Sequence, residues 1–177
     1  MTGPARILVI DDDASVRRVI AAALEDEGYV VDPAENGKQA IEMTHAKVYH
    51  LALIDVRLPD IEGTKLLSEL KETTPKMVKI IVTGYPSMQN AIEAVKKGAD
   101  DFVVKPFKME ELLNAIKRRL KTQQEEREYS EAKVKEYIET RIDERDHDWM
   151  KARSGEGTRQ TPGPKTRSRG RRHRSAP

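Results

Sequence analysis

Five short apolar runs alternate with five amphipathic stretches over residues 6–120, and this alternation limits the fold more than any other feature. The apolar runs are rich in β-branched residues and lie at 6–10, 29–31, 51–54, 78–82 and 102–104. The stretches with apolar residues at helical spacing lie at 15–27, 37–47, 63–73, 87–97 and 108–120. Strands that alternate with helices predict an α/β fold, in which helices cover both faces of a parallel sheet.

The second apolar run indicates the order of the strands. It is short, and Asp32-Pro33 closes it before Asn36-Gly37 turns the chain. Proline has no N–H to donate to a neighbouring strand, so this strand is expected at an edge of the sheet. An edge position for the second strand fits a flavodoxin-like, doubly wound, five-stranded sheet with the order 2-1-3-4-5.

The composition excludes several classes of protein. There is no cysteine, so neither disulfides nor thiolate-bound metals are expected. No apolar run approaches the ~20 residues that span a bilayer, and the N-terminus lacks a signal-peptide pattern. These features predict a cytoplasmic protein with no membrane partner.

The charge pattern changes after residue 120. Residues 121–150 carry six Lys/Arg and ten Asp/Glu, whereas residues 151–177 carry nine and one. Segments that differ so strongly in charge rarely share one core. We therefore predict a folded domain over 5–120, a charged helical extension over 121–150 and a basic disordered tail over 151–177.

The extension is predicted to be a mostly solvated helix that continues the fifth helix of the domain. Val134, Ile138 and Ile142 form a narrow apolar stripe along it. The stripe fits either a surface helix or a short seam between two copies of the chain in a homodimer.

The tail carries no sign of a DNA-binding helix-turn-helix or of a nucleotide-binding P-loop. Gly, Pro, Ser, Thr and Arg dominate it, which is typical of disorder. It fits either a solvated segment without a specific partner or a weak, salt-dependent contact with nucleic acid. The arginines that would make that contact are Arg167, Arg169, Arg171, Arg172 and Arg174.

Polar residues follow several of the predicted strands. Asp11 and Asp12 follow the first strand, Asp55 the third, Thr83 the fourth and Lys105 the fifth. In open α/β sheets, ligands bind beyond the carboxyl ends of the strands, where the strand order reverses. For the order 2-1-3-4-5 that point lies between the first and third strands, so the three carboxylates are expected in one crevice.

Such a cluster suits a magnesium site next to a phosphoryl group. Mg²⁺ prefers oxygen ligands and would relieve the repulsion between the carboxylates, and a carboxylate can be a nucleophile that forms an aspartyl phosphate. Taken singly, each residue also has a simpler interpretation, as a helix cap, a turn residue or a surface charge. Asp13 or Ser15 can cap the following helix, which leaves Asp11 and Asp12 free for a metal.

Four motifs, in this order and spacing, resemble the CheY-like receiver domain of two-component response regulators. They are ILVIDDD at 7–13, LALIDVRLPDIEG at 51–63, IIVTGY at 80–85 and DDFVVKPF at 100–107. The resemblance covers about residues 5–120, and together the motifs are highly specific. It implies a phosphorelay protein that takes part in its own phosphotransfer and is not otherwise an enzyme.

The resemblance also implies roles for individual residues. Asp55 would accept a phosphoryl group from a sensor histidine kinase, and Asp11, Asp12 and Asp55 would bind Mg²⁺ together with the main-chain carbonyl of Arg57. Lys105 would contact the phosphoryl group, and its bond to Pro106 is expected to be cis.

The resemblance also implies a conformational change on phosphorylation and the residues that carry it. Thr83 would move to bind a phosphoryl oxygen, and Phe102 would then turn inward. The face formed by 87–97, 102–104 and 108–120 would change its affinity for an unknown downstream protein. Phe102 lacks the hydroxyl of the tyrosine often found at its position. We also hypothesise that bulky Arg57 and Tyr85 tune the lifetime of the phosphoryl group.

One alternative belongs to another class of protein. Asp11 to Ser15 partly fit the start of haloacid-dehalogenase-like phosphatases, in which Asp11 would be the nucleophile and Asp13 the general acid. Ser15 departs from that motif, and no cap insertion is visible.

Overall fold

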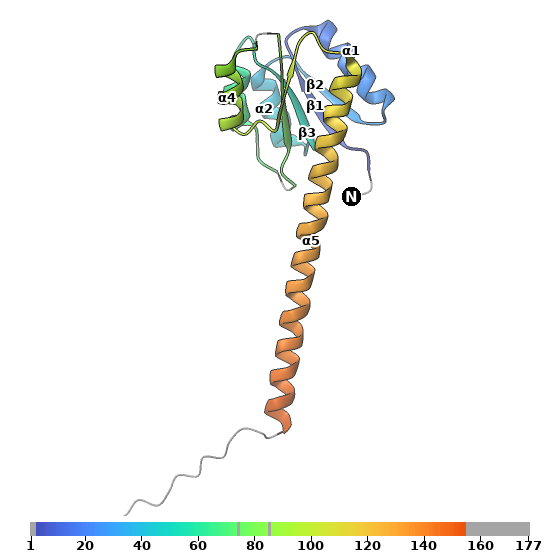
Figure 1. Ribbon diagram of the computed structural model, residues 1–177, viewed down its shortest axis with the longest axis vertical. Coiled ribbons are helices and arrows are strands. Elements are labelled where there is room, and N and C mark those ends of the chain that lie inside the picture. The colour runs from blue at the N-terminus through green and yellow to red at the C-terminus, as the bar shows by residue number, and fades with distance from the viewer. Residues whose placement is uncertain (1–2, 74, 85, 155–177) are drawn as a thin grey trace, which may run out of the picture. The chain divides into compact units, whose positions relative to one another are not determined.

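The computed structural model describes residues 3–73, 75–84 and 86–154 of the 177-residue chain. The chain divides into two compact units, residues 1–131 and 132–177, which are described separately. The first unit contains the sheet and the helices that cover it (Figure 1).

Five parallel strands form one sheet in the order β2-β1-β3-β4-β5 (Figure 1). The strands are β1 (Arg6–Ile10), β2 (Val30–Ala34), β3 (Leu51–Asp55), β4 (Val78–Thr83) and β5 (Asp101–Val104). In the register of the sheet, Ile10 lies opposite Ile54, and Asp55 lies opposite Val82. The predicted strand order is confirmed, and its reversal point lies between β1 and β3.

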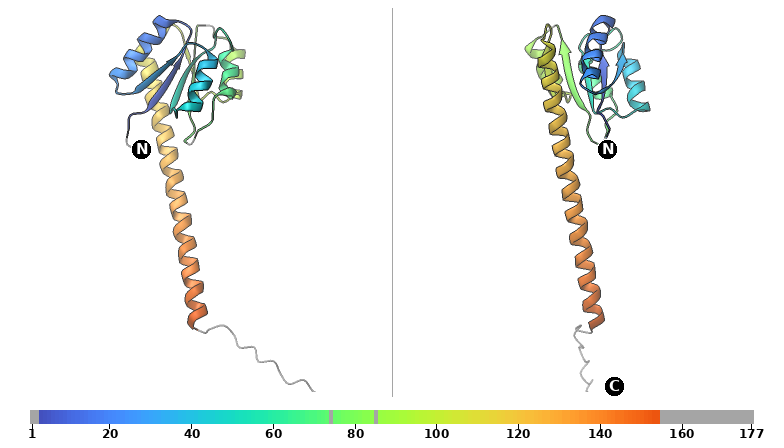
Figure 2. Two further views of the ribbon diagram at one scale, coloured as in Figure 1. Left: turned by 180° about the vertical axis from the view of Figure 1, so that it is seen from behind. Right: turned by 90° about the vertical axis from the view of Figure 1, so that its right-hand side faces the viewer.

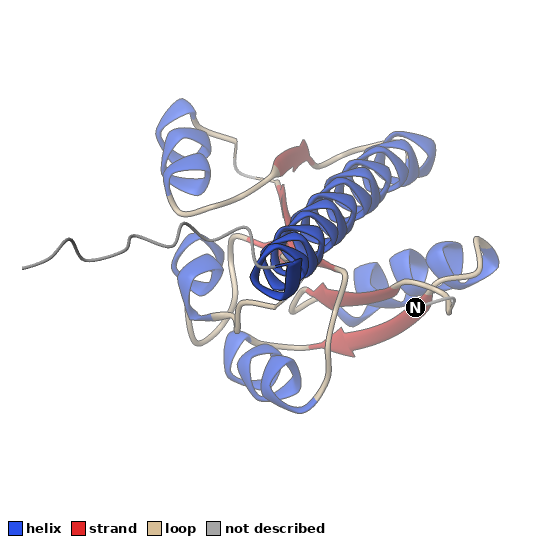
Figure 3. Ribbon diagram, turned by 90° about the horizontal axis from the view of Figure 1, so that it is seen from below, coloured by secondary structure: helices blue, strands red, loops and turns tan. Residues whose placement is uncertain are grey.

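Helices cover both faces of the sheet (Figure 2, Figure 3). They are α1 (Ala14–Asp26), α2 (Gly37–Ala46), α3 (Gly63–Glu69), α4 (Met88–Lys96) and α5 (Met109–Ser154). Side chains of α1 and α5 pack on one face, and side chains of α2, α3 and α4 pack on the other. This is the doubly wound α/β arrangement expected from the alternation of strands and helices.

The core consists of one apolar cluster on each side of the sheet. In β1, Ile7 and Val9 join the cluster with α1 and α5, whereas Leu8 and Ile10 join the cluster with α2, α3 and α4. All four are at most 1% exposed, and burying a side chain of this size contributes about 1.5–3 kcal/mol. Because β1 is packed on both faces, it gives Asp11, the residue that follows it, a rigid base.

The second strand differs from the prediction at its end. Asp32-Pro33 does not close it, because β2 continues to Ala34 and Val9 lies opposite Pro33. Proline is tolerated there since β2 is an edge strand, as predicted, and has a neighbour on one side only.

The third helix is shorter than the predicted 63–73. It ends at Glu69, and the buried Leu70 has an extended backbone with ψ of 134°. Beyond the helix, the Thr73 hydroxyl donates a hydrogen bond to the carbonyl oxygen of Pro75.

The second unit, considered by itself, is helical in its described part. α5 continues to Ser154, which confirms the predicted helical extension. Val134, Ile138 and Ile142 are 59%, 50% and 47% exposed. Residues 155–177 lie outside the described residues, so the disordered tail and its five arginines stay predictions. Among the helices of the described ranges, none has the length and apolar character that a membrane span requires.

Candidate functional site

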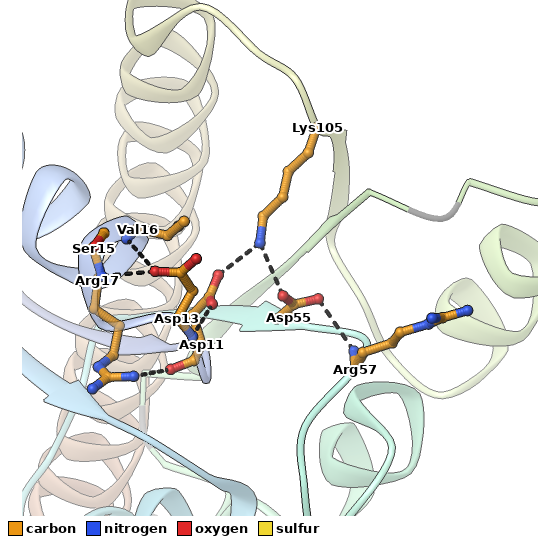
Figure 4. A network of polar contacts seen from close by, with 8 residues as sticks. All are labelled: Asp11, Asp13, Ser15, Val16, Arg17, Asp55, Arg57 and Lys105. Atoms are coloured by element: carbon orange, nitrogen blue, oxygen red, sulfur yellow. Dashed lines mark hydrogen bonds and ion pairs between the residues drawn. The ribbon is translucent and has the colours of Figure 1, made fainter.

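The residues at the strand ends converge at one edge of the sheet (Figure 4). Asp11 directly follows β1, Asp55 and Thr83 are the last residues of β3 and β4, and Lys105 directly follows β5. Because all strands are parallel, their carboxyl ends meet at this edge. The structure therefore brings together residues that are far apart in the sequence.

The ammonium group of Lys105 links two of the carboxylates (Figure 4). Its Nζ lies 2.7 Å from Asp11 Oδ2 and 2.9 Å from Asp55 Oδ2. Burial by itself lowers the pKa of Lys105, but the hydrogen bonds to Asp11 and Asp55 outweigh it and raise the pKa above its usual value. The backbone N–H of Lys105 donates to the carbonyl oxygen of Thr83, and the Lys105–Pro106 bond is cis, as expected.

Asp12 completes a cluster of three carboxylates. One carboxylate oxygen from each of Asp11, Asp12 and Asp55 lies within 4.8 Å of the others. Asp11 and Asp55 are buried, whereas Asp12 is exposed. With the Lys105 ammonium counted, the cluster keeps two uncompensated negative charges, and its donors are all oxygens. This donor set and charge fit one Mg²⁺ ion, which prefers oxygen ligands and keeps several waters.

Four hydrogen bonds hold Asp11. Its carboxylate accepts one from Lys105 and one from the backbone N–H of Asp13 at 2.9 Å. Its own N–H donates to the carbonyl oxygen of Ala34 at 3.2 Å. Its carbonyl oxygen accepts a bond of 2.6 Å from Nη1 of Arg17. Both the side chain and the main chain of Asp11 therefore have fixed directions.

Asp13 has a different role from its two acidic neighbours. It is the N-cap of α1, and its Oδ1 accepts from the N–H groups of Ser15 and Val16 at 2.7 and 3.2 Å. The bond from Val16, followed by that from Ser15, lowers the pKa of Asp13. The cap thus uses the third acid of the run and leaves Asp11 and Asp12 at the carboxylate cluster.

The loop after β3 positions Asp55. The N–H of Arg57 donates to Asp55 Oδ1 at 3.2 Å, and the N–H of Gly63 donates to the carbonyl oxygen of Val56 at 2.8 Å. A methyl group at Gly63 would overlap the carbonyl group of Asp55, so only glycine allows this close approach. The Arg57 side chain points away from the carboxylate cluster (Figure 4).

Asp60 connects the same loop to α2. Its carboxylate accepts bonds of 2.9 and 2.7 Å from the N–H groups of Gly37 and Lys38 at the start of α2. Burial acts to raise the pKa of Asp60, but these and other backbone bonds lower it overall. Asp60 therefore ties the middle of the loop that carries Arg57 to the start of α2.

The two expected switch residues lie on the neighbouring strands β4 and β5. Thr83 is fully buried, and Phe102 is partly buried against the core cluster on the side of α2, α3 and α4. Tyr85, the other residue hypothesised to tune phosphoryl lifetime, lies outside the described residues.

Three residues of this site were not predicted from the sequence: Arg17, Asp60 and Gly63. Arginine is common on helix surfaces, and aspartate is common in turns. The contacts of Arg17 with Asp11 and of Asp60 with the start of α2 do not join residues at a recognisable spacing. Gly63 stands at the end of the DIEG segment, where a turn glycine is ordinary, and nothing local signals its contact with Asp55.

Comparison with known proteins decides the family. A sequence profile of the response regulator receiver domain matches residues 7–117. The chain belongs to this family. The match supports the receiver interpretation over the phosphatase alternative, in which Asp11 and Asp13 would react.

Solved structures of receiver proteins resemble this one. A CheY-like receiver domain protein from Methanospirillum hungatei is 38% identical with a TM-score of 0.67, and the match covers 70% of this chain and 99% of that one. NtrX from Brucella abortus is 32% identical with a TM-score of 0.67, over 72% of this chain and 29% of that one.

Curated relatives include longer proteins. The transcriptional regulatory protein ZraR of Klebsiella oxytoca is 41% identical over 106 residues, which are 60% of this chain and 24% of that protein. The regulatory protein AtoC of Escherichia coli is 34% identical over 128 residues, 72% of this chain and 28% of that protein. The matched part of the receiver chain thus spans about a quarter of these relatives.

Proposed function

We propose that this receiver domain accepts a phosphoryl group on Asp55 from a phosphohistidine of a sensor histidine kinase. The observation that carries the proposal is the convergence of Asp55, Asp11 and Lys105, joined by hydrogen bonds of 2.7 and 2.9 Å. Isolated acids at strand ends have many roles, but an ammonium group that bridges two of them suits the binding of a third, anionic group.

In the proposed reaction, a carboxylate oxygen of Asp55 attacks phosphorus. The new bond joins that oxygen to phosphorus, and the bond from phosphorus to the imidazole nitrogen breaks and leaves its electron pair on that nitrogen. The Lys105 ammonium then moves from its carboxylate partners to a phosphoryl oxygen. The Thr83 hydroxyl donates a hydrogen bond to a second phosphoryl oxygen. The chain is a phosphoacceptor that also takes part in its own dephosphorylation.

Asp11, Asp12 and Asp55 are the proposed ligands of Mg²⁺, together with the main-chain carbonyl of Arg57. When bound, the ion neutralises negative charge on the transferred phosphoryl oxygens. The three carboxylates would hold the ion, and the bonds from the loop after β3 would keep the Arg57 carbonyl in place.

Phosphorylation is proposed to change the face formed by α4, β5 and α5. The Thr83 hydroxyl moves toward the phosphoryl group, and Phe102 fills the space that Thr83 leaves. Ile92, Val95 and Val104 give this face exposed apolar surface, at 48%, 68% and 43% exposure. Apolar surface of this kind suits a partner protein.

The partners beyond the kinase are proposed at the level of class. The two curated relatives are regulatory proteins, and ZraR is a regulator of transcription, so we propose a regulatory output in the cytoplasm. The arginines of the tail would add a weak contact with nucleic acid. Deleting residues 151–177 and measuring nucleic-acid binding at several salt concentrations tests this contact, since unchanged affinity would rule it out.

A second copy of the chain is a further proposed partner. Val134, Ile138 and Ile142 recur every four residues on the described helix of the second unit, and all three are exposed. A two-fold interface pairs the same surface of each copy, so one apolar stripe suffices. Sedimentation of the wild type and of Ile138→Lys tests this, and a concentration-independent monomer in both would end the proposal.

The phosphoryl mimic beryllofluoride tests the proposed switch. With Mg²⁺, we expect it to shift the amide NMR signals of α4 and β5 in the wild type. The same addition to Asp55→Asn should leave those signals unchanged. Equal shifts in both proteins would show that the change at α4 and β5 does not depend on Asp55.

A further inference from the structure

The side chain of Arg17 reaches from α1 to the end of β1 (Figure 4). Its Nη1 donates to the carbonyl oxygen of Asp11 at 2.6 Å, and its Nη2 lies 3.6 Å from the Glu35 carboxylate. The side chain of Arg17 is only 11% exposed. A guanidinium group buried to this degree and bonded to one particular carbonyl is more than a solvated surface charge.

The bonded carbonyl belongs to the peptide group between Asp11 and Asp12. A peptide group is planar, so fixing its oxygen also fixes the direction in which the chain enters Asp12. Asp12 is exposed, so packing does not orient it. The Asp11 carboxylate, in contrast, is held independently by Asp13 and Lys105.

We propose that Arg17 is a positioning residue of the magnesium site, because it locks the Asp11–Asp12 peptide and thereby directs the Asp12 carboxylate toward the ion. The inference rests on the proposed function of Asp11 and Asp12 as metal ligands. The Glu35 carboxylate, just after β2, lies at ion-pair distance from the second nitrogen of the guanidinium group, but it is 68% exposed, so the bond to Asp11 is the contact that fixes Arg17.

Arg17 has two opposing effects on a bound cation. Its positive charge repels Mg²⁺, whereas its hydrogen bond preorganises the main chain that carries the Asp12 carboxylate. Because the guanidinium group forms a short bond to the main chain between two of the proposed ligands, we expect its effect on position to be the larger one. Residues that orient metal ligands typically contribute about 10- to 100-fold to metal affinity.

Substitutions separate the two effects. Arg17→Lys keeps the charge but loses the planar fork and its reach, and Arg17→Gln loses both. Arg18 provides the matched control, because it is the next residue, is exposed and donates to the Ala14 carbonyl of its own helix. Mg²⁺ affinity is measured by calorimetry without any phosphodonor, and urea unfolding without metal establishes that each variant is folded.

We expect Arg17→Lys and Arg17→Gln to weaken Mg²⁺ binding by about tenfold each, and Arg18→Lys to leave it unchanged. With acetyl phosphate, the Arg17 variants should need more Mg²⁺ for half-maximal phosphorylation yet reach a rate close to that of the wild type at saturation. An effect on folding alone would not produce this separation.

Unchanged affinity in Arg17→Lys, or tighter binding in Arg17→Gln, would overturn the inference while leaving the metal site itself intact. Failure of the wild type to bind Mg²⁺ would instead overturn the proposed function, and with it the inference. The wild-type titration therefore distinguishes the two failures.

Discussion

Nζ of Lys105 lies 2.9 Å from Oδ2 of Asp55, although the two residues are 50 positions apart in the chain. The ammonium group thus lies where the cation and the phosphoryl group are proposed to bind. Its charge compensates the carboxylates in the absence of metal. Mg²⁺ must therefore compete with Lys105 for the same oxygens, and this competition can be measured.

Lys105→Met is expected to bind Mg²⁺ about tenfold more tightly than the wild type, since it removes a positive charge a few ångströms from the ion. The same variant should accept a phosphoryl group from acetyl phosphate at least about tenfold more slowly, because the group that stabilises the transferred oxygens is lost. Calorimetry measures the first effect and intact-mass time courses the second. Lys121→Met, at an exposed position of α5, is the control, and weaker Mg²⁺ binding by Lys105→Met would contradict the competition.

Gly63→Ala is expected to destabilise the domain. The added methyl group would overlap the carbonyl group of Asp55, so the backbone must shift, at a cost of about 1–3 kcal/mol in the free energy of unfolding. Urea unfolding measures this, with Gly3→Ala as control because nothing lies near that position. Equal free energies of unfolding for the two variants would contradict this prediction. The backbone near the Asp55 carbonyl would then accommodate the added methyl group at no cost.

His50 gives the stability of the domain a dependence on pH. Burial, the largest influence, lowers the pKa of His50 below its usual 6.5, and Nδ1 accepts a bond of 3.0 Å from the N–H of Arg6. The unfolded chain therefore takes up a proton at a higher pH than the folded one. The contribution to stability is complete above about pH 6.5 and is lost as the pH falls below that value.

His50→Asn tests this origin, because the Asn oxygen can accept the same bond without titrating in this range. The fall in the free energy of unfolding between about pH 7.5 and about pH 5.5 should be smaller in this variant than in the wild type. If the free energy of unfolding fell equally in both proteins, groups other than His50 would cause the pH dependence.

Arg57→Ala is expected to shorten the lifetime of the phosphoryl group by roughly threefold or more, because water reaches Asp55 more easily when a bulky neighbour is removed. The side chain points away from Asp55 in this structure, so shielding requires it to turn once the phosphoryl group is bound (Figure 4). Loss of the adduct after removal of the phosphodonor gives the rate. Arg18→Ala is the control, and an unchanged rate in Arg57→Ala would end the hypothesis.

The features that the sequence predicted correctly are those with local signals. Alternating apolar runs and helical stripes predicted the five strands, and Pro33 predicted that the second strand lies at an edge. The place before the helix left Asp13 and Ser15 as possible caps, and the structure shows that Asp13 is the cap. The parallel topology then placed Asp11, Asp55 and Lys105 at one edge, because strand ends meet there whatever the details of packing.

The remaining features depend on contacts between distant residues. The bond from Arg17 to Asp11, the bonds from α2 to Asp60 and the approach of Gly63 to Asp55 have no periodic signal. The end of β2 and the end of α3 were misplaced by a few residues, because tertiary packing decides how far an edge strand or a short helix continues. The sequence thus predicted which polar groups meet at the strand ends better than it predicted the residues that hold them in place.

The central claim is that Asp55, and no other residue, accepts the phosphoryl group. The most direct measurement is intact mass after incubation with Mg²⁺ and acetyl phosphate, for the wild type, Asp55→Asn and Asp11→Asn. We predict a single phosphoryl adduct on the wild type that requires Mg²⁺ and is absent from Asp55→Asn. An adduct that forms at full yield on Asp55→Asn, and is lost only in Asp11→Asn, would contradict the account and favour Asp11 as the nucleophile.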